Sequence, residues 1–263
     1  MKSIFSLLAL PLALFVGVLP SFAADKPKDV SVSKKPILLV LTNHGKLGDT
    51  GKPTGFFLSE AAHPWKVFKA AGYTVEIASP AGGFAPLDPK SDDLTDPANQ
   101  TFWDANGKEV NGVKGVSETL DLSKLKPETY AAVFYAGGHG AMWDFAESEA
   151  VQKFTANVYE NGGSVGAVCH GPAALAKVTL SDGSPLVKGK KVAIFTNAEE
   201  AAVELTSTVP FLLQDSLNAA GASSIVGENF KENAVRDGRL VTGQNPASAT
   251  LAAKLLVESL TEK

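Results

Sequence analysis

The chain has 263 residues, of which 44% are hydrophobic and 20% charged, and its formal net charge at pH 7 is −4. This length suits one sizeable domain or two small ones. A net negative charge without a cluster of lysine and arginine excludes a nucleic-acid partner from our expectations, and a single cysteine excludes an internal disulfide.

The N-terminal residues have the pattern of an export signal followed by a polar tether. A lysine at position 2 precedes an almost wholly apolar run at 4–19, and Ser21-Phe22-Ala23 has small residues at the positions that a signal peptidase requires. The apolar run is short for a membrane span, which needs roughly 20 residues. We therefore expect a signal peptide at 1–23 cleaved after Ala23, a tether at 24–35, and an α/β domain at 36–263 that works in the periplasm or outside the cell, with no membrane partner after cleavage.

The rest of the chain alternates between short apolar strands and helices. Residues 36–42 form a continuous apolar run, typical of a parallel strand covered on both faces. Further strands are expected at 73–78, 130–135, in the run that enters Cys169, at 191–195 and in a hairpin at 234–242; helices are expected at 56–71, 147–161, from 171, at 210–220 and at 247–260. Residues 79–115 are too many for a plain connection, so we expect an insertion that either has a function or covers part of the domain. This alternation predicts a doubly wound, mostly parallel sheet with helices on both faces.

Cys169 lies where a predicted strand turns into a helix. Small residues stand two positions to either side, at Ala167 and Gly171, which is the pattern of a nucleophile elbow. Reactive groups of such sheets gather at the carboxyl ends of the strands. The helix start and the neighbouring His170 both favour ionisation of the thiol, so we expect a thiolate. The alternative is a buried structural cysteine.

The four histidines restrict the choice of base, since none follows His170. A glutaminase triad takes its histidine from far downstream of the cysteine, so that arrangement is excluded. The base is then His170 or an earlier histidine, with a third group orienting the imidazole. Glu199 and Glu200 both stand at the end of the predicted strand at 191–195. No histidine–carboxylate spacing indicates a metal, and we expect no cofactor.

Several motifs in one order resemble the DJ-1/PfpI superfamily, and most closely its heat-shock protein 31-like branch. These are Ala-Val-Cys-His-Gly-Pro at 167–172, Ala-Gly-Gly-His-Gly at 136–140, the segment 54–64 and Thr-Gly-Gln-Asn-Pro-Ala-Ser at 242–248. The resemblance implies a flavodoxin-like α/β fold and a glutathione-independent glyoxalase of the glyoxalase III (D-lactate dehydratase) type. Such an enzyme converts methylglyoxal or related 2-oxoaldehydes to 2-hydroxy acids in defence against carbonyl stress. The branch is also associated with deglycase and holdase chaperone behaviour, and its members are commonly homodimers.

By position, the resemblance assigns Cys169 as the nucleophile, His170 as its partner and Glu200, ahead of Glu199, as the third member of the triad. It also matches Glu60 to an acidic residue that approaches the sulfur. Because the neighbours of Glu60 in sequence are largely apolar, we expect a buried carboxyl with a raised pKa. The backbone N–H groups of Gly138 and His170 are implied as an oxyanion hole.

The substrate pocket is expected near His44, His139 and Asn245, although the two histidines equally suit hydrogen bonds that stabilise loops. If the insertion at 79–115 and the loop at 245–246 cover the cysteine, a small 2-oxoaldehyde is favoured; an open groove favours a cysteine peptidase or amidase. A chaperone for unfolded or glycated proteins needs an exposed apolar patch of more than a few hundred Å² and works without Cys169.

Overall fold

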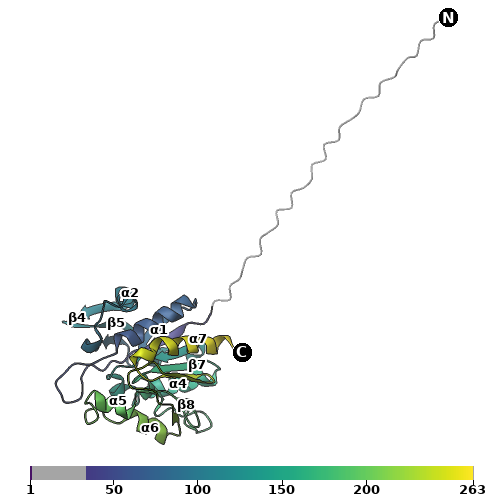
Figure 1. Ribbon diagram of the computed structural model, residues 1–263. Helices are drawn as coiled ribbons and strands as arrows, with labels where there is room; N and C mark the ends of the chain where they lie inside the picture. Colours follow the sequence, from purple (N-terminus) through teal and green to yellow (C-terminus); the bar gives the residue numbers. More distant parts are fainter. Residues whose placement is uncertain (2–33, 263) are drawn as a thin grey trace. The chain divides into compact units, whose positions relative to one another are not determined.

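The computed structural model describes Met1 and residues 34–262, so the predicted signal peptide and nearly all of the predicted tether lie outside the described residues (Figure 1). Within residues 34–262, every helix falls short of the length and apolar character that a membrane crossing needs.

The centre of the domain is a nine-stranded sheet in the order β10-β11-β7-β6-β1-β2-β5-β3, with β4 paired to β5. Its strands are β1 (Ile37–Val40), β2 (Val75–Ser79), β3 (Gly83–Pro86), β4 (Gly107–Val110), β5 (Val113–Asp121), β6 (Ala132–Tyr135), β7 (Ser164–Val168), β10 (Ala234–Asp237) and β11 (Leu240–Gly243). The pairs from β11 through β7, β6, β1 and β2 to β5 are all parallel. All four residues of β1 are completely buried, because both faces of the sheet are covered.

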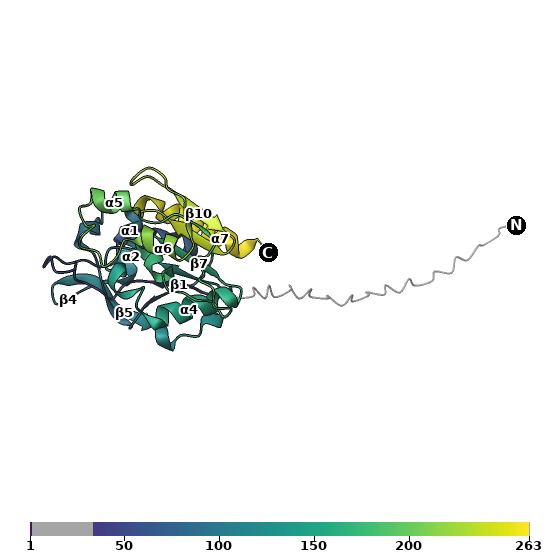
Figure 2. The ribbon, with the colours of Figure 1, turned by 90° about the horizontal axis from the view of Figure 1, so that it is seen from below.

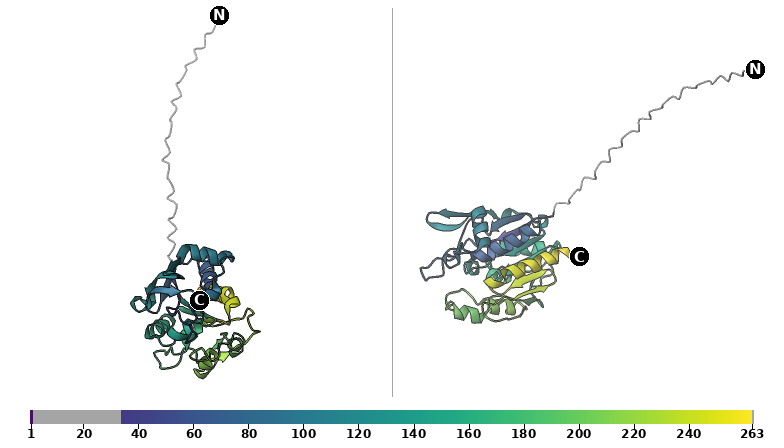
Figure 3. Two further views of the ribbon diagram at one scale, coloured as in Figure 1. Left: turned by 90° about the vertical axis from the view of Figure 1, so that its left-hand side faces the viewer. Right: turned by 45° about the horizontal axis from the view of Figure 1, so that its top comes forward.

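Helices cover the two faces of this sheet. On one face α1 (Leu58–Ala70) lies beside α7 (Ala249–Thr261), as Figures 1 and 3 show, and on the opposite face α4 (Glu149–Glu160) packs against β6 and β7 (Figure 2). The remaining α-helices are α2 (Pro97–Asn106), α3 (Ala141–Asp144), α5 (Asn197–Ala202) and α6 (Leu213–Ala219). The predicted doubly wound, mostly parallel α/β fold is confirmed.

Two predicted elements differ in detail. Of the strand expected at 191–195, only β8 (Lys191–Val192) pairs, and it pairs with β9 (Ser223–Ser224) in a separate two-stranded sheet. The residues that follow Val192 do not continue this strand. They run to the end of β7, where the Phe195 N–H donates to the Cys169 carbonyl at 3.2 Å. The helix expected from residue 171 is a five-residue 3₁₀ helix, Gly171–Leu175.

The insertion at 79–115 contains β3, α2, β4 and the start of β5, and it extends the sheet beyond β2. It contacts the residues that lead into α1: the Phe56 N–H donates to the Pro86 carbonyl, and the Leu58 N–H to the Ser91 hydroxyl, both at 2.9 Å. Phe57, the N-cap of α1, makes no side-chain cap hydrogen bond, so the insertion supplies the acceptor for the first helical N–H. The insertion therefore fixes the start of the helix that carries Glu60.

Candidate active site

Cys169 directly follows β7 in a strained backbone conformation. Its φ is +58°, in a region that residues other than glycine rarely adopt and that costs about 1–3 kcal/mol. Neighbouring backbone holds this conformation, since the Cys169 N–H donates to the Gly243 carbonyl at 2.9 Å. At Gly171 a Cβ atom would overlap with the Tyr135 carbonyl oxygen, so only glycine fits there. The sharp turn predicted from small flanking residues is thus present.

Three side chains, which we call the Cys169 triad, meet at this turn: Cys169, His170 and Glu200. The Cys169 Sγ lies 3.2 Å from His170 Nδ1, and His170 Nε2 lies 2.8 Å from Glu200 Oε2. The side chains of His170 and Glu200 are 1% and 3% exposed, so water is largely excluded from the triad. Glu200 comes from α5 and the other two from the turn after β7, so the fold brings together residues that are 30 positions apart.

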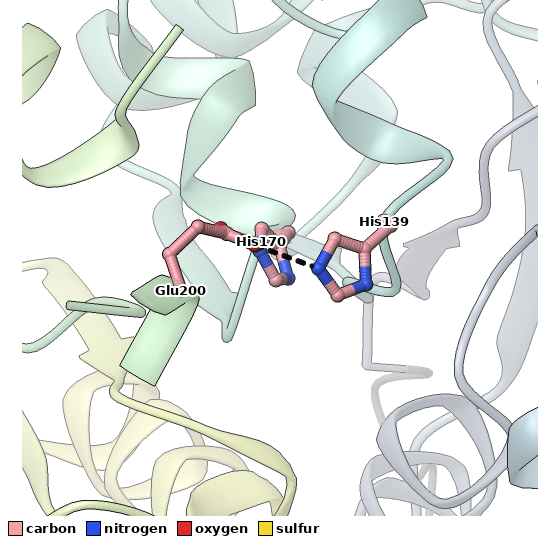
Figure 4. Close-up of side chains that lie close together, drawn as sticks. All are labelled: His139, His170 and Glu200. Atoms are coloured by element: carbon pink, nitrogen blue, oxygen red, sulfur yellow. Dashed lines mark hydrogen bonds and ion pairs between the residues drawn. The ribbon is translucent and has the colours of Figure 1, made fainter. Parts of the chain in front are cut away.

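A second imidazole binds the other oxygen of the same carboxylate. His139 Nε2 lies 3.0 Å from Glu200 Oε1, and Figure 4 shows both imidazoles next to Glu200. Burial alone would raise the pKa of Glu200, but hydrogen bonds from His139 and His170 outweigh it and lower that pKa to about 2. An ionised carboxylate only accepts hydrogen bonds, which assigns the hydrogen of each ring to Nε2. The Nδ1 lone pair of His170 therefore faces the thiol.

His139, His170 and Glu200 also form a compact group of metal-ligand types, with ligand atoms within 4.8 Å of one another. The sequence showed no metal spacing because these residues lie in three separate segments. Each Nε2 atom is hydrogen-bonded to Glu200, so a metal ion bound here would have to displace the hydrogens that the rings donate to the carboxylate.

Glu60, from α1, is completely buried on the other side of the sulfur. Its Oε2 accepts a hydrogen bond from the Gly137 N–H at 2.9 Å, and its Oε1 has no hydrogen bond of ordinary geometry among the described residues. Burial raises the pKa of Glu60 to about 8, although interactions with the Cys169 thiol and the Gly137 N–H act in the opposite direction. This carboxyl is mostly protonated at neutral pH, in agreement with the expectation from its apolar neighbours.

The expectation of a resting thiolate is wrong. Burial raises the pKa of the Cys169 thiol well above its ordinary value, and the Glu60 and Glu200 carboxyls add to the rise. Burial, together with the interaction with His139, lowers the pKa of His170 to about 4, so this ring supplies no positive charge at neutral pH. The 3₁₀ helix that follows has five residues, too few for a substantial dipole. The sulfur therefore rests as a thiol that faces the His170 lone pair.

The loop after β6 brings backbone N–H groups to the same place. Gly138 has a φ of +99°, and a Cβ atom on Gly137 would lie 2.7 Å from the His170 nitrogen and 2.6 Å from Glu60 Oε2. Among the described residues, the N–H groups of Gly138 and His170 donate to no backbone carbonyl. The oxyanion hole that the resemblance implies from these two N–H groups stays a prediction.

The structure places the residues expected to line the pocket in different ways. Asn245 is completely buried, and its amide donates to Glu199 Oε1 at 2.9 Å and to the Lys231 carbonyl at 2.8 Å, so it holds a loop instead of lining a pocket. His44 Nε2 lies 2.6 Å from the Lys46 carbonyl oxygen, and its ring stacks on Trp143. These contacts fit the alternative in which His44 stabilises a loop. Cys169 itself is 3% exposed.

The sequence pattern of the DJ-1/PfpI family matches residues 53–259. The chain belongs to the DJ-1/PfpI family. Glyoxalase 3 of Candida albicans is 34% identical over 227 residues, which cover 83% of this chain and 95% of that protein. The glutathione-independent glyoxalase HSP31 of Saccharomyces cerevisiae is 31% identical over 239 residues, covering 87% and 99%. The crystal structure of glyoxalase III from Candida albicans superposes with a TM-score of 0.76 at 32% identity, covering 85% of this chain and 96% of that one.

Glu199 has a structural part in this DJ-1/PfpI site that our sequence analysis missed. It is completely buried and accepts hydrogen bonds from the Thr196 backbone and hydroxyl, both at 3.0 Å, and from the Phe230 N–H at 2.8 Å. Thr196 and Glu199 form a capping box, which fixes the start of α5 and so places Glu200. The Thr-x-x-Glu spacing was the sequence signal that would have identified it.

Proposed function

We propose that the protein is a glutathione-independent glyoxalase that converts methylglyoxal or related 2-oxoaldehydes to 2-hydroxy acids. The observation that carries the proposal is the thiol of Cys169, held on a strained turn 3.2 Å from the unprotonated nitrogen of His170. The names of the relatives in Candida albicans and Saccharomyces cerevisiae support the substrate class. Glutathione is unnecessary because the protein supplies its own sulfur nucleophile.

The first step is addition of sulfur to the aldehyde carbon. His170 Nδ1 takes the thiol proton while the carbon–sulfur bond forms, and the electron pair of the C=O double bond moves onto oxygen. The N–H groups of Gly138 and His170 stabilise the resulting oxyanion. Glu200 stabilises the imidazolium through Nε2, and oxygen then takes a proton to give a hemithioacetal.

The second step moves hydrogen between the two substrate carbons. A base removes the proton from the former aldehyde carbon, an enediol forms, and protonation of the neighbouring carbon gives a 2-hydroxy thioester. Glu60 and His170 both lie beside the sulfur, and their pKa values are about 8 and about 4. General acid–base groups typically contribute about 10²–10⁴-fold in rate. Water then cleaves the thioester, releasing the acid and the thiol, so the net reaction consumes one water and no oxidant.

The burial of the sulfur supports a small substrate over a peptide or amide. Cys169 is 3% exposed, and a carbonyl of three or four carbon atoms needs far less room than a polypeptide. A holdase role is a second candidate, favoured by three exposed apolar side chains in one loop: Ile225 at 40%, Val226 at 55% and Phe230 at 46%. If this loop binds unfolded or glycated protein, suppression of client aggregation persists in Cys169→Ala and weakens in a Val226→Ser, Phe230→Ser variant.

The site of action is a further part of the proposal. The pattern of residues 1–23 supports export, followed by activity in the periplasm or outside the cell. Sequencing of the N-terminus of the protein recovered from those fractions should begin at Ala24; a chain that retains Met1 in the cytoplasm contradicts export.

The decisive experiment is formation of D-lactate from methylglyoxal without glutathione. Cys169→Ala should form none, and Glu60→Gln should lower kcat by about 10²-fold or more. Glu149→Gln, on an exposed position of α4, is the matched control and should behave as the native protein. Melting temperatures establish that each variant is folded. Substantial lactate formation by Cys169→Ala, or none by the native protein, overturns the proposal.

A further inference from the structure

We propose that His139 is a positioning residue, which holds the Glu200 carboxylate from the side opposite His170 and thereby fixes the arrangement of protons in the Cys169 triad. This inference rests on the proposed function only for its effect on catalysis. The proton arrangement itself is a property of the free protein and can be measured without substrate.

The geometry gives the two imidazoles nearly equivalent places on one carboxylate. Glu200 Oε2 lies 2.8 Å from His170 Nε2, and Glu200 Oε1 lies 3.0 Å from His139 Nε2. The two rings are in contact, with centroids 4.1 Å apart (Figure 4). Each oxygen of Glu200 thus has its own donor, and the carboxylate is oriented by both rings.

His139 matters because nothing else among the described side chains donates a hydrogen bond to Glu200 Oε1. Glu200 is 3% exposed, so loss of this donor leaves a buried ionised oxygen unpaired, which is energetically unfavourable. The carboxylate is then held from one side only and can rotate away from His170 Nε2. That rotation weakens the preference of His170 for hydrogen on Nε2, on which the free lone pair at Nδ1 depends.

The position of His139 in the chain adds a second consequence. It directly follows Gly138 in the loop after β6, whose Gly137 N–H donates to Glu60 Oε2 at 2.9 Å, while Glu200 belongs to α5. The hydrogen bond between their side chains therefore connects the proposed oxyanion-binding loop to the acid of the triad. Replacing His139 should disturb the two together.

Charged and titratable groups from four segments face His170. His139 comes from the loop after β6, Glu199 and Glu200 from α5, and Cys169 from the turn after β7, with Glu60 of α1 beyond the sulfur. Burial lowers the pKa of His170 and the interaction with His139 lowers it further, whereas the two α5 carboxylates raise it. A neutral residue at position 139 should consequently make His170 more basic.

The test uses two variants of the full chain. His139→Gln retains an amide N–H for Glu200 Oε1 but cannot titrate, and His139→Leu has neither property. With ¹⁵N-labelled histidine, the four rings of the native protein are few enough to assign. The native spectrum should show hydrogen on Nε2 of both His139 and His170. His170 should stay neutral to about pH 4.

In His139→Leu, we expect His170 to titrate at higher pH and to lose its single tautomer, and kcat/KM for methylglyoxal to fall about tenfold, with its acid limb moved to higher pH. His139→Gln should keep the tautomer and lose less than about threefold in kcat/KM, while its His170 also titrates at higher pH. The His63 ring, which binds Asp96 elsewhere, serves as an internal control and should not change.

An unchanged tautomer and titration of His170 in His139→Leu overturn the inference, whatever happens to activity. So does native His139 with hydrogen on Nδ1. If the native protein forms no D-lactate, the proposed function fails, but these spectra still decide the role of His139. If His139→Leu does not fold, the native spectrum decides: hydrogen on Nε2 of His139 supports the hydrogen bond to Glu200, and hydrogen on Nδ1 overturns the inference.

Discussion

Two places in the molecule have a similar arrangement, in which an imidazole lies between a carboxylate and a thiol or hydroxyl, but they differ in burial and backbone conformation. The Cys169 triad joins a thiol, an imidazole and a carboxylate. On the outer side of the domain, Thr250 Oγ1 lies 3.2 Å from His63 Nδ1, and His63 Nε2 lies 3.0 Å from Asp96 Oδ2. We call these three residues the His63 cluster. Its distances match those of the triad to within 0.2 Å.

Burial and backbone separate the two places. In the His63 cluster the imidazole and carboxylate are 26% and 33% exposed, against 1% and 3% in the triad. Asp96 also accepts from the first N–H groups of α2 as its N-cap, and Thr250 lies in the first turn of α7. The His63 cluster thus connects three helices with ordinary backbone. Hydrogen-bond distances alone do not distinguish a reactive group from a structural one; strain, exclusion of water and a second acid do.

The largest expected effect concerns Glu60, the acid that the His63 cluster lacks. Its native pKa is about 8, against 4.5 in a model compound. Between these values the unfolded chain has lost the proton and the native protein retains it. The contribution of this proton to stability is therefore full below pH 4.5 and is lost as the pH rises to 8, by roughly 4 kcal/mol.

Glu60→Gln has no such proton, so its free energy of unfolding does not lose this contribution. Between pH 4.5 and pH 8 the stability of Glu60→Gln relative to the native protein should therefore rise by this amount. Urea unfolding of both proteins at several pH values measures the difference. Asp96→Asn, in the exposed cluster, is the contrasting variant, because the pKa of that carboxyl is lowered and its effect falls at acid pH. A difference between native and Glu60→Gln that stays constant with pH would contradict the buried, protonated state.

The next effect is steric. A methyl group at position 137 would lie 2.6 Å from Glu60 Oε2 and 2.7 Å from the His170 nitrogen, so Gly137→Ala must push the parts of the site away from one another. We expect kcat/KM to fall at least about tenfold, as a misplacement of about 1 Å can cost far more. Gly163→Ala is the matched control, since its Cβ would be as crowded, 2.8 Å from Val158, but lies at the far end of β7. Equal losses of activity in the two variants would show that general destabilisation is the cause.

Much of this arrangement could be predicted from sequence because it is local. The apolar run at 36–42 and the small residues around Cys169 encode a buried strand and a sharp turn by their own chemistry. Cys169 and His170 are neighbours in the chain, so their contact needs no knowledge of tertiary structure. The roles of Glu60 and Glu200 came from the family resemblance, and the structure places Glu60 next to Cys169 and Glu200 against His170.

The parts that sequence did not provide depend on contacts between distant segments. His139 and Glu200 are 61 positions apart, and nothing in either segment indicates that they share a hydrogen bond. The thiolate was expected from local rules for cysteine, but the ionisation of Cys169 is governed by burial and by carboxyls from α1 and α5. Asn245 was expected to line the pocket, but its side chain points inward and donates a hydrogen bond to Glu199. The direction of that side chain depends on a contact with a distant segment.

The smallest effect tests the His63 cluster directly. His63→Ala removes hydrogen bonds to Asp96 and Thr250, which should lower the free energy of unfolding by about 1 kcal/mol, the usual net worth of such bonds at a partly exposed site. Activity with methylglyoxal should stay within about twofold of native, because none of the three helices is displaced far enough to move Glu60 on α1. Thr250→Val, which removes one of the two bonds, should lose less stability and no activity. A tenfold fall in kcat/KM for His63→Ala would mean that α1 transmits the change to Glu60, and the two places would then act as one.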